Sequence, residues 1–168
     1  MKKMRKGFTL LELLVVIGVM GILGATGMVA GQEATNAARA TTIADGLEKA
    51  ATAMMMYYSD NAQLIAAGTL TATTALVATG ANAYLKTADA LQTSATPGKY
   101  SVTVVGEDAS AKWWIGYTFL GTDGSLKTMI ANKAKRMGLK STTTIEENKT
   151  IDDVADYTDG ATVYMLVR

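Results

Sequence analysis

The sequence contains no cysteine, no histidine and a single proline, Pro97. Without cysteine or histidine, the chain cannot use a thiol or an imidazole in catalysis, form a disulfide, or bind a metal through the usual sulfur and nitrogen ligands. A glycine-rich phosphate-binding loop is also missing from the sequence, which argues against nucleotide hydrolysis. The composition therefore excludes the commonest catalytic and metal-binding arrangements, and other features have to indicate the function.

Charged residues are scarce over one long stretch near the start of the chain. The 24 residues from Phe8 to Gly31 contain one charged side chain, Glu12. As an α-helix rising about 1.5 Å per residue, this run is roughly 36 Å long, which is enough to cross a hydrocarbon core of about 30 Å. We therefore expect residues 8–31 to form a membrane-spanning helix.

The residues before this apolar run carry most of the positive charge of the N-terminal region. They are Lys2, Lys3, Arg5 and Lys6, and Gly7 follows them. By the positive-inside rule, such a cluster keeps the N-terminus in the cytoplasm and places the rest of the chain on the other side of the membrane. Glu12 needs a separate explanation, because an acidic residue inside a membrane helix costs about 2.5–3.5 kcal/mol on insertion scales and usually has a partner.

A basic leader, Gly7, the sequence Phe8-Thr9-Leu10-Leu11-Glu12 and an unbroken apolar helix follow one another in this order. The combination resembles the precursor of a type IV pilin or a type II secretion pseudopilin. The resemblance implies that a prepilin peptidase cleaves between Gly7 and Phe8 and methylates the new N-terminus on Phe8. It also implies that Glu12 recruits the terminal amine of an adjacent protomer and sets its axial register during assembly.

The residues themselves support a role for Glu12 after cleavage. Cleavage creates a cation at Phe8, and Glu12 lies four residues further on, which is the same face of a helix. The amine could be neutralised by the same chain's Glu12 or by that of a neighbour. Removal of residues 1–7 takes away four of the 16 Lys and Arg residues, which leaves 12 of them against 15 acidic residues.

Two other interpretations of the N-terminus compete with this one. An ordinary secretory signal peptide has an apolar core of about 7–15 residues and a small-x-small cleavage site. Here the core is longer and contains Glu12, although Met28-Val29-Ala30 has the form of a cleavage site. A plain membrane anchor with an incidental glutamate is the second alternative. Neither explains the Gly7-Phe8 junction, so we favour the pilin-like interpretation.

The rest of the chain predicts an α+β fold, in which the long N-terminal helix packs on a small antiparallel β-sheet as in type IV pilins. Residues 32–60 are predicted to continue the helix, because apolar side chains recur on one side at helical spacing. These are Ala40, Ile43, Leu47, Ala50, Ala51, Met54, Tyr57 and Tyr58. Asp45 and Lys49, on the other side, are spaced to form an ion pair.

Residues 61–98 are expected to form a variable loop region with a short helix around residues 84–91. Residues 99–168 are expected to form the sheet and an inserted helix. Alternating patterns at 100–105 and 113–119, separated by a polar turn, predict an antiparallel hairpin. A helix is predicted from Asp123 to a stop near Gly138, and a final strand is predicted at residues 161–167.

Two charged clusters suggest ligands. One is an acidic loop containing Asp152, Asp153, Asp156 and Asp159. Calcium prefers several oxygen ligands, but these residues lack the EF-hand spacing. Some pseudopilins bind calcium in such a loop, so calcium is a weak candidate, and otherwise we expect no cofactor. The other is a cationic cluster on the predicted helix, for which we favour a solvated surface over nucleic-acid binding, since no aromatic residues interleave to stack bases.

We therefore expect a non-enzymatic structural subunit, the major pilin of a bacterial type IV pilus, which polymerises with itself after processing. The implied partners are a prepilin peptidase, an assembly platform with its ATPase, and the cytoplasmic membrane before assembly. The precursor would be a single-pass inner-membrane protein with an extracytoplasmic C-terminal domain, and the product an extracellular pilus. The alternative is a pseudopilin in a periplasmic pseudopilus. A membrane-anchored binding module or enzyme is a third and weaker hypothesis.

Overall fold

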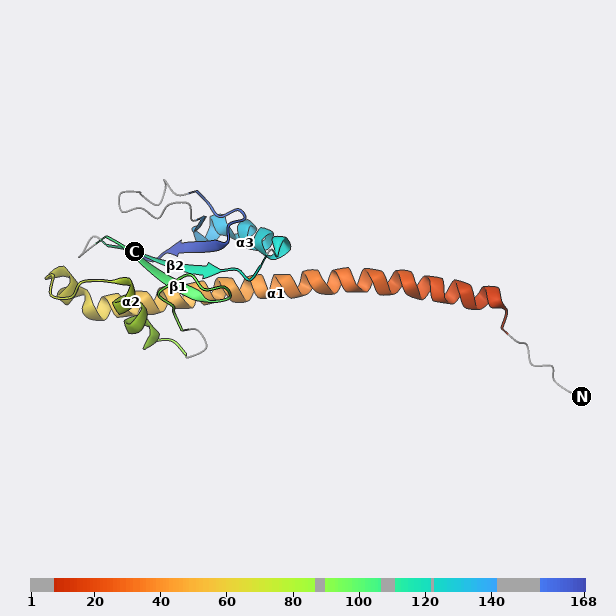
Figure 1. Ribbon diagram of the computed structural model, residues 1–168, viewed down its shortest axis with the longest axis horizontal. Coiled ribbons are helices and arrows are strands. Elements are labelled where there is room, and N and C mark those ends of the chain that lie inside the picture. The colour runs from red at the N-terminus through yellow and green to blue at the C-terminus, as the bar shows by residue number, and fades with distance from the viewer. Residues whose placement is uncertain (1–7, 87–89, 107–110, 122, 142–154) are drawn as a thin grey trace, which may run out of the picture. The chain divides into compact units, whose positions relative to one another are not determined.

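The computed structural model describes residues 8–86, 90–106, 111–121, 123–141 and 155–168 (Figure 1). The elements follow one another as helix α1 (Leu10–Ala66), helix α2 (Thr74–Asn82), strands β1 (Tyr100–Val105) and β2 (Lys112–Thr118), helix α3 (Gly124–Met137), and strands β3 (Leu139–Ser141) and β4 (Thr162–Leu166). The chain divides into two compact units, Met1–Asn36 and Ala37–Arg168, and α1 begins in the first and ends in the second. This long N-terminal helix with a small antiparallel sheet confirms the predicted α+β class.

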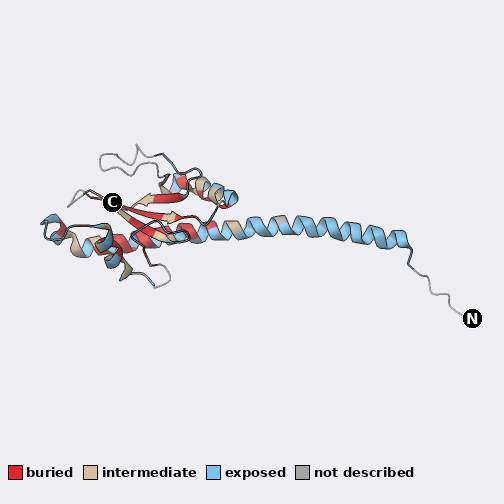
Figure 2. Ribbon diagram, in the orientation of Figure 1, coloured by how far each residue is buried: buried red, intermediate tan, exposed pale blue. Residues whose placement is uncertain are grey.

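In the first unit, the described residues form the N-terminal part of α1. Its apolar side chains are exposed, as Figure 2 shows, and Leu10 and Met28 are each more than 80% accessible. Helix α1 is long and apolar enough to cross a membrane, by length and composition. A continuous apolar surface of this extent needs a cover of lipid or of other apolar helices.

In the second unit, one face of α1 is buried at the positions that the helical spacing predicted. Ala40, Leu47 and Met54 are at most 1% exposed, and of the eight predicted residues only Tyr58 is half-buried rather than buried. The opposite side of the helix is exposed, and Asp45 and Lys49 lie on it. These two residues do not form the predicted ion pair, because the one ion pair within the described residues joins Lys140 and Asp156.

The second unit contains a four-stranded antiparallel sheet in the order β1-β2-β4-β3. Val102 of β1 pairs with Ile115 of β2, and Ile115 pairs with Met165 of β4. The β1–β2 pairing confirms the predicted hairpin, and β4 confirms the predicted final strand. Because side chains alternate across a strand, this register directs Val102, Trp113 and Ile115 to one face.

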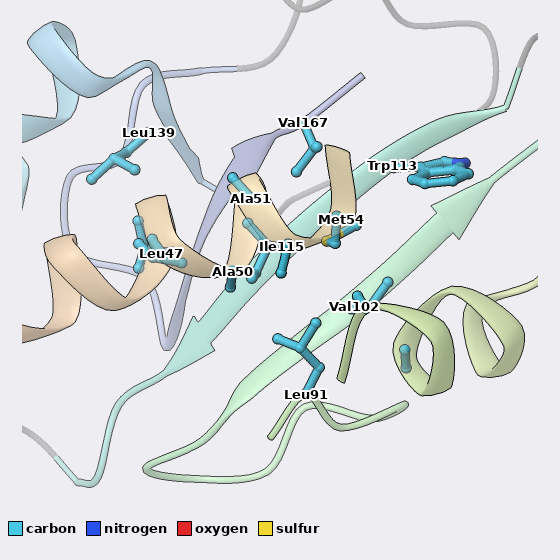
Figure 3. Close-up of a cluster of buried hydrophobic side chains, with 14 of the residues drawn as sticks. Leu47, Ala50, Ala51, Met54, Leu91, Val102, Trp113, Ile115, Leu139 and Val167 are labelled. Atoms are coloured by element: carbon cyan, nitrogen blue, oxygen red, sulfur yellow. The ribbon is translucent and has the colours of Figure 1, made fainter. Parts of the chain in front are cut away.

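The main hydrophobic core lies between this face of the sheet and the buried face of α1. Figure 3 shows Leu47 and Met54 of α1 near Ile115 and Trp113 of β2. The Trp113 ring meets the Tyr58 ring edge-on, with centroids 5.4 Å apart. Trp114 points to the other face of the sheet, where it forms a small separate cluster with Tyr164 and their neighbours.

A glycine in α1 makes room for the first residue of the sheet. The phenol of Tyr100 lies against Gly46, and a Cβ atom added at Gly46 would overlap the Tyr100 hydroxyl. That hydroxyl donates to the backbone carbonyl oxygens of Thr42 and Ile43 at 3.4 Å each. The bare backbone at Gly46 therefore lets β1 approach α1 closely enough for this contact.

Replacement of Gly46 by alanine should destabilise the second unit, because the added methyl group has to displace the Tyr100 ring. Overpacking of this kind costs about 1–3 kcal/mol. Urea denaturation of the detergent-solubilised full chain, followed by circular dichroism, measures the effect. Gly124→Ala at the first position of α3 is the matched control, because nothing lies within 4 Å of its added Cβ, and it should not lower stability. Equal stabilities for the two variants would contradict this role of Gly46.

The region 61–98 differs from its prediction in two respects. Helix α1 continues to Ala66, beyond the expected end at residue 60, and a second helix, α2, occupies Thr74–Asn82. Thr73 caps α2 by accepting a hydrogen bond from the Leu76 N–H at 3.3 Å. A helix therefore forms earlier in this region than the sequence pattern suggested.

The short helix predicted around residues 84–91 is wrong for the described residues of that stretch. Asn82 holds the following chain in a loop, because its side-chain amide donates to the Leu91 carbonyl oxygen at 3.1 Å and its carbonyl accepts from the Leu91 N–H at 2.7 Å. Tyr84 donates to the Asp60 carboxylate instead of joining a helical face. Ala88, which belonged to the predicted helix, lies outside the described residues.

Helix α3 ends as predicted, with Gly138 in the left-handed conformation at φ 64°. Strand β3 follows at once and pairs with β4, Leu139 opposite Met165. This strand was not predicted, because only three residues take part and the polar sequence after them is not typical of a strand.

Candidate functional site

The first turn of α1 contains a local hydrogen-bond pair between Thr9 and Glu12. The Glu12 N–H donates to Thr9 Oγ1 at 3.2 Å, and the Thr9 N–H donates to Glu12 Oε2 at 3.4 Å. The Thr9 hydroxyl also lies 3.3 Å from Glu12 Oε2 and donates to it. Because α1 begins at Leu10, Thr9 is the N-cap residue and Glu12 is at the third helical position. This is a capping box.

The capping box explains how an acidic residue is accommodated at the start of an apolar helix. Glu12 satisfies a backbone N–H that the helix leaves without a partner, and a negative charge in the first turn interacts favourably with the helix dipole. The Thr9 N–H and the Thr9 hydroxyl both donate to Oε2, and within the described residues no hydrogen bond reaches Oε1. One carboxylate oxygen is therefore available to an incoming cation.

The sequence predicted a role for Glu12 but none for Thr9. The signal was present, since threonine followed three residues later by glutamate and then by an apolar run is the pattern of a capping box.

Phe8 precedes the helix and is 82% exposed. The pairing of Phe8 with Glu12 on one helical face assumed that the helix begins at Phe8, and the structure differs because the capping box starts α1 at Leu10. Phe8 therefore lies outside the helix, before the capping box. Gly7 lies outside the described residues, so cleavage between Gly7 and Phe8 and methylation of Phe8 stay predictions.

Two of the four aspartates proposed for calcium lie in the described part of the chain. Asp156 accepts a hydrogen bond from Lys140 Nζ at 2.8 Å, and this bond and the lysine charge lower the pKa of Asp156. Asp159 accepts from the Thr158 hydroxyl at 3.3 Å. Among the residues that the structure describes, no group of three or more His, Cys, Asp or Glu side chains is placed to hold a metal ion.

The described aspartates therefore do not by themselves fit a calcium ion. Lys140 already neutralises Asp156, and a calcium ion would have to displace the lysine ammonium group. Asp152 and Asp153 lie outside the described residues. A calcium site that uses all four stays a prediction.

The lysines on α3 contact the protein itself at two positions. Lys133 Nζ donates to the Thr41 hydroxyl of α1 at 3.0 Å, and Lys127 places its ammonium 5.9 Å from the centroid of the Phe119 ring. Lys135 and Arg136 are exposed. These contacts connect α3 with α1 and with the end of β2, and they explain part of the cationic cluster structurally.

Comparison with known proteins addresses the N-terminal features directly. Residues 2–28 match the family described as the prokaryotic N-terminal methylation motif. No curated protein and no solved structure matches the chain. The matched residues contain the basic leader, the Gly7-Phe8 junction and the capping box of α1.

The matched motif is the class III signal peptide of type IV pilins and pseudopilins. The motif therefore supports a type IV pilin-like or pseudopilin-like precursor, and the long N-terminal helix and antiparallel sheet form an arrangement like that of a type IV pilin. Precursors with this signal are in general processed by a prepilin peptidase and form structural, non-enzymatic polymers. The signal and the single apolar helix fit a single-pass membrane precursor.

Proposed function

We propose that this chain is the major subunit of a type IV pilus and that it has no enzymatic activity. The observation that supports this most strongly is the succession of a class III signal peptide, a glutamate in the capping box of α1, and a long exposed apolar helix. Each part has a use in a polymer that is assembled from a membrane. The signal supplies a new N-terminus, the glutamate supplies its partner, and the helix supplies the surface that subunits share.

Cleavage between Gly7 and Phe8 would place an ammonium group two residues before the start of α1. In the same chain, Glu12 is already bonded to Thr9 through Oε2. Its Oε1 is available to the amine of a neighbouring subunit, which would dock at a fixed axial position. Pairing of a carboxylate with a cation offsets part of the cost of placing either charge in an apolar environment.

The apolar part of α1 would occupy two environments in succession. In the cytoplasmic membrane its exposed leucine, valine and isoleucine side chains would contact lipid, and in the filament they would contact the helices of other subunits. The second unit would form the outer surface. An assembly platform and its ATPase would drive the transfer.

Recovery of the chain from the cell surface tests this proposal. Mechanical shearing of intact cells should release fibres in which this chain is the main protein, and deletion of its gene should remove them. A pseudopilus, the alternative, would leave the chain in the envelope fraction after shearing. Retention of all of the protein in the membrane, without any polymer, would contradict both.

A further inference from the structure

A pocket of about 350 Å³ lies on the second unit, between α1 and the segment that follows α2. Its lining residues are Lys49, Thr52, Ala53, Met56, Tyr84, Leu85 and Lys86. Met56 is half exposed, at 50%, and contributes apolar surface together with Ala53 and Leu85. Within the described residues neither lysine forms an ion pair. The pocket is thus a largely apolar hollow with two ammonium groups that form no ion pair within the described residues.

A projecting apolar side chain lies elsewhere on the same unit. Leu120, just after β2, is 66% exposed, more than any other large apolar side chain described in the second unit. The preceding residue fixes the position of Leu120. Phe119 is buried, and the Phe119 N–H donates to the Ala161 carbonyl oxygen at 2.9 Å. Leu120 also packs beside Gly98, where an added Cβ would lie 2.6 Å from its side chain.

The carboxylate of Asp123 lies three residues after Leu120 in the chain. Asp123 is the N-cap residue of α3, yet its side chain makes no capping hydrogen bond. Lys127, one turn further on, places its ammonium over the Phe119 ring and forms no ion pair with Asp123. Leu120 and Asp123, three residues apart in the chain, supply an apolar group and a negative charge, which complement an apolar pocket lined by two lysines.

The two surfaces lie at different levels along α1. Tyr117 of β2 pairs with Tyr100, whose hydroxyl is bonded to the Thr42 carbonyl oxygen. The end of β2 is therefore level with Thr42, whereas the pocket extends from Lys49 to Met56, roughly 10–20 Å further along the helix. One chain cannot bring the two surfaces together. Complementary patches at different places on one chain allow a head-to-tail contact, which extends into an open polymer when the rotation between subunits does not close.

We propose that Leu120 of one subunit inserts into the pocket beside Met56 of a second copy of this chain, and that Asp123 then pairs with Lys86 or Lys49. The proposal rests on the proposed function, since it describes how the outer domains of a filament contact one another. The contact is heterologous, so each subunit uses its leucine toward one neighbour and its pocket toward another.

The lack of cysteine makes a cross-linking test specific, because an engineered pair has no native thiol to compete with it. The full chain carrying Leu120→Cys and Met56→Cys should assemble, since both side chains are at least half exposed. Mild oxidation of the sheared fibres should give a ladder of disulfide-linked multimers on a non-reducing gel. The control pair is Leu120→Cys with Met55→Cys, because Met55 is exposed to a similar extent, 54% against 50%, but does not line the pocket.

The ladder should contain most of the cross-linked protein in the first pair and be at least tenfold weaker in the control. Dimers alone would contradict a head-to-tail contact, and equal ladders would contradict the assigned pocket. Wild-type cells without any fibres would overturn the proposed function and this interface with it. Fibres that form normally but give no ladder from the first pair would overturn the interface alone.

A charge exchange provides a second test that does not depend on cysteine chemistry. Asp123→Lys and Lys86→Glu should each lower the yield of sheared fibres several-fold, because each places like charges at the contact. The double variant should restore most of the yield. A double variant whose yield equals the product of the two single losses would show that the residues act separately and would refute their pairing.

Discussion

Cells that produce only the Glu12→Gln variant should cleave the precursor and insert it into the membrane but should release no fibres. Glutamine can still accept the Thr9 N–H at the third position of a capping box, so the start of α1 is retained. It cannot neutralise an ammonium group. If the carboxylate is the partner of a neighbour's amine, as we propose, the loss of charge alone should abolish assembly. Immunoblots of the sheared fraction and of the membrane fraction measure the two outcomes.

Substitution of Thr9 supplies the matched control for this experiment. Thr9→Val removes the hydroxyl that caps α1 and keeps the charge of Glu12, and loss of an N-cap costs about 0.5–2 kcal/mol of helix stability. We expect fibres from Thr9→Val at reduced yield. Normal fibres from Glu12→Gln without any wild-type subunit would contradict the charge role, and a complete loss from Thr9→Val would show that the cap and not the charge is limiting.

The second large effect is expected in the core of the second unit. Trp113→Ala should lower the free energy of unfolding by about 3–5 kcal/mol, because it removes a fully buried indole from the contact between β2 and α1. The Tyr57 and Tyr58 rings would lose their neighbour at 6.2 and 5.4 Å. Urea denaturation of the detergent-solubilised full chain, followed by circular dichroism, measures the loss.

Trp114→Ala is the corresponding control, since the two tryptophans are adjacent in sequence and both are buried. Trp114 lies in the small cluster on the opposite face of the sheet, where its neighbours are Tyr164 and the partly buried Val105 and Leu166. We expect a smaller loss, because half-exposed neighbours can close over the space more easily than the main core can. A Trp113→Ala loss below about 1 kcal/mol would contradict the assignment of this side chain to the central core.

The elements that the sequence predicted are those with a strong local pattern. The apolar stripe of α1 repeats at helical spacing over more than four turns, and residues such as Leu47 and Met54 are buried as expected. Strands β1 and β2 alternate clearly, and Gly138 ends α3 in the left-handed conformation that glycine favours. In these places local propensity and tertiary packing agree.

The elements that were missed depend on contacts between distant residues. Helix α2 is rich in alanine and threonine and contains Gly80, and it packs where the Tyr57 ring lies against that glycine. Strand β3 has three residues and exists because β4, more than 20 residues later, pairs with it. The pocket beside Met56 likewise requires the chain to return to α1 at Tyr84 and Leu85. No local pattern encodes these contacts.

The mass of the N-terminal peptide in sheared fibres tests the central claim most directly. If the chain is a processed filament subunit, mass spectrometry should find a chain that begins at Phe8 and carries one additional methyl group, with residues 1–7 absent. A fibre or membrane protein that retains residues 1–7 would contradict processing. A chain that begins after Ala30 would show that the segment is an ordinary signal peptide and would remove the helix on which the proposed polymer depends.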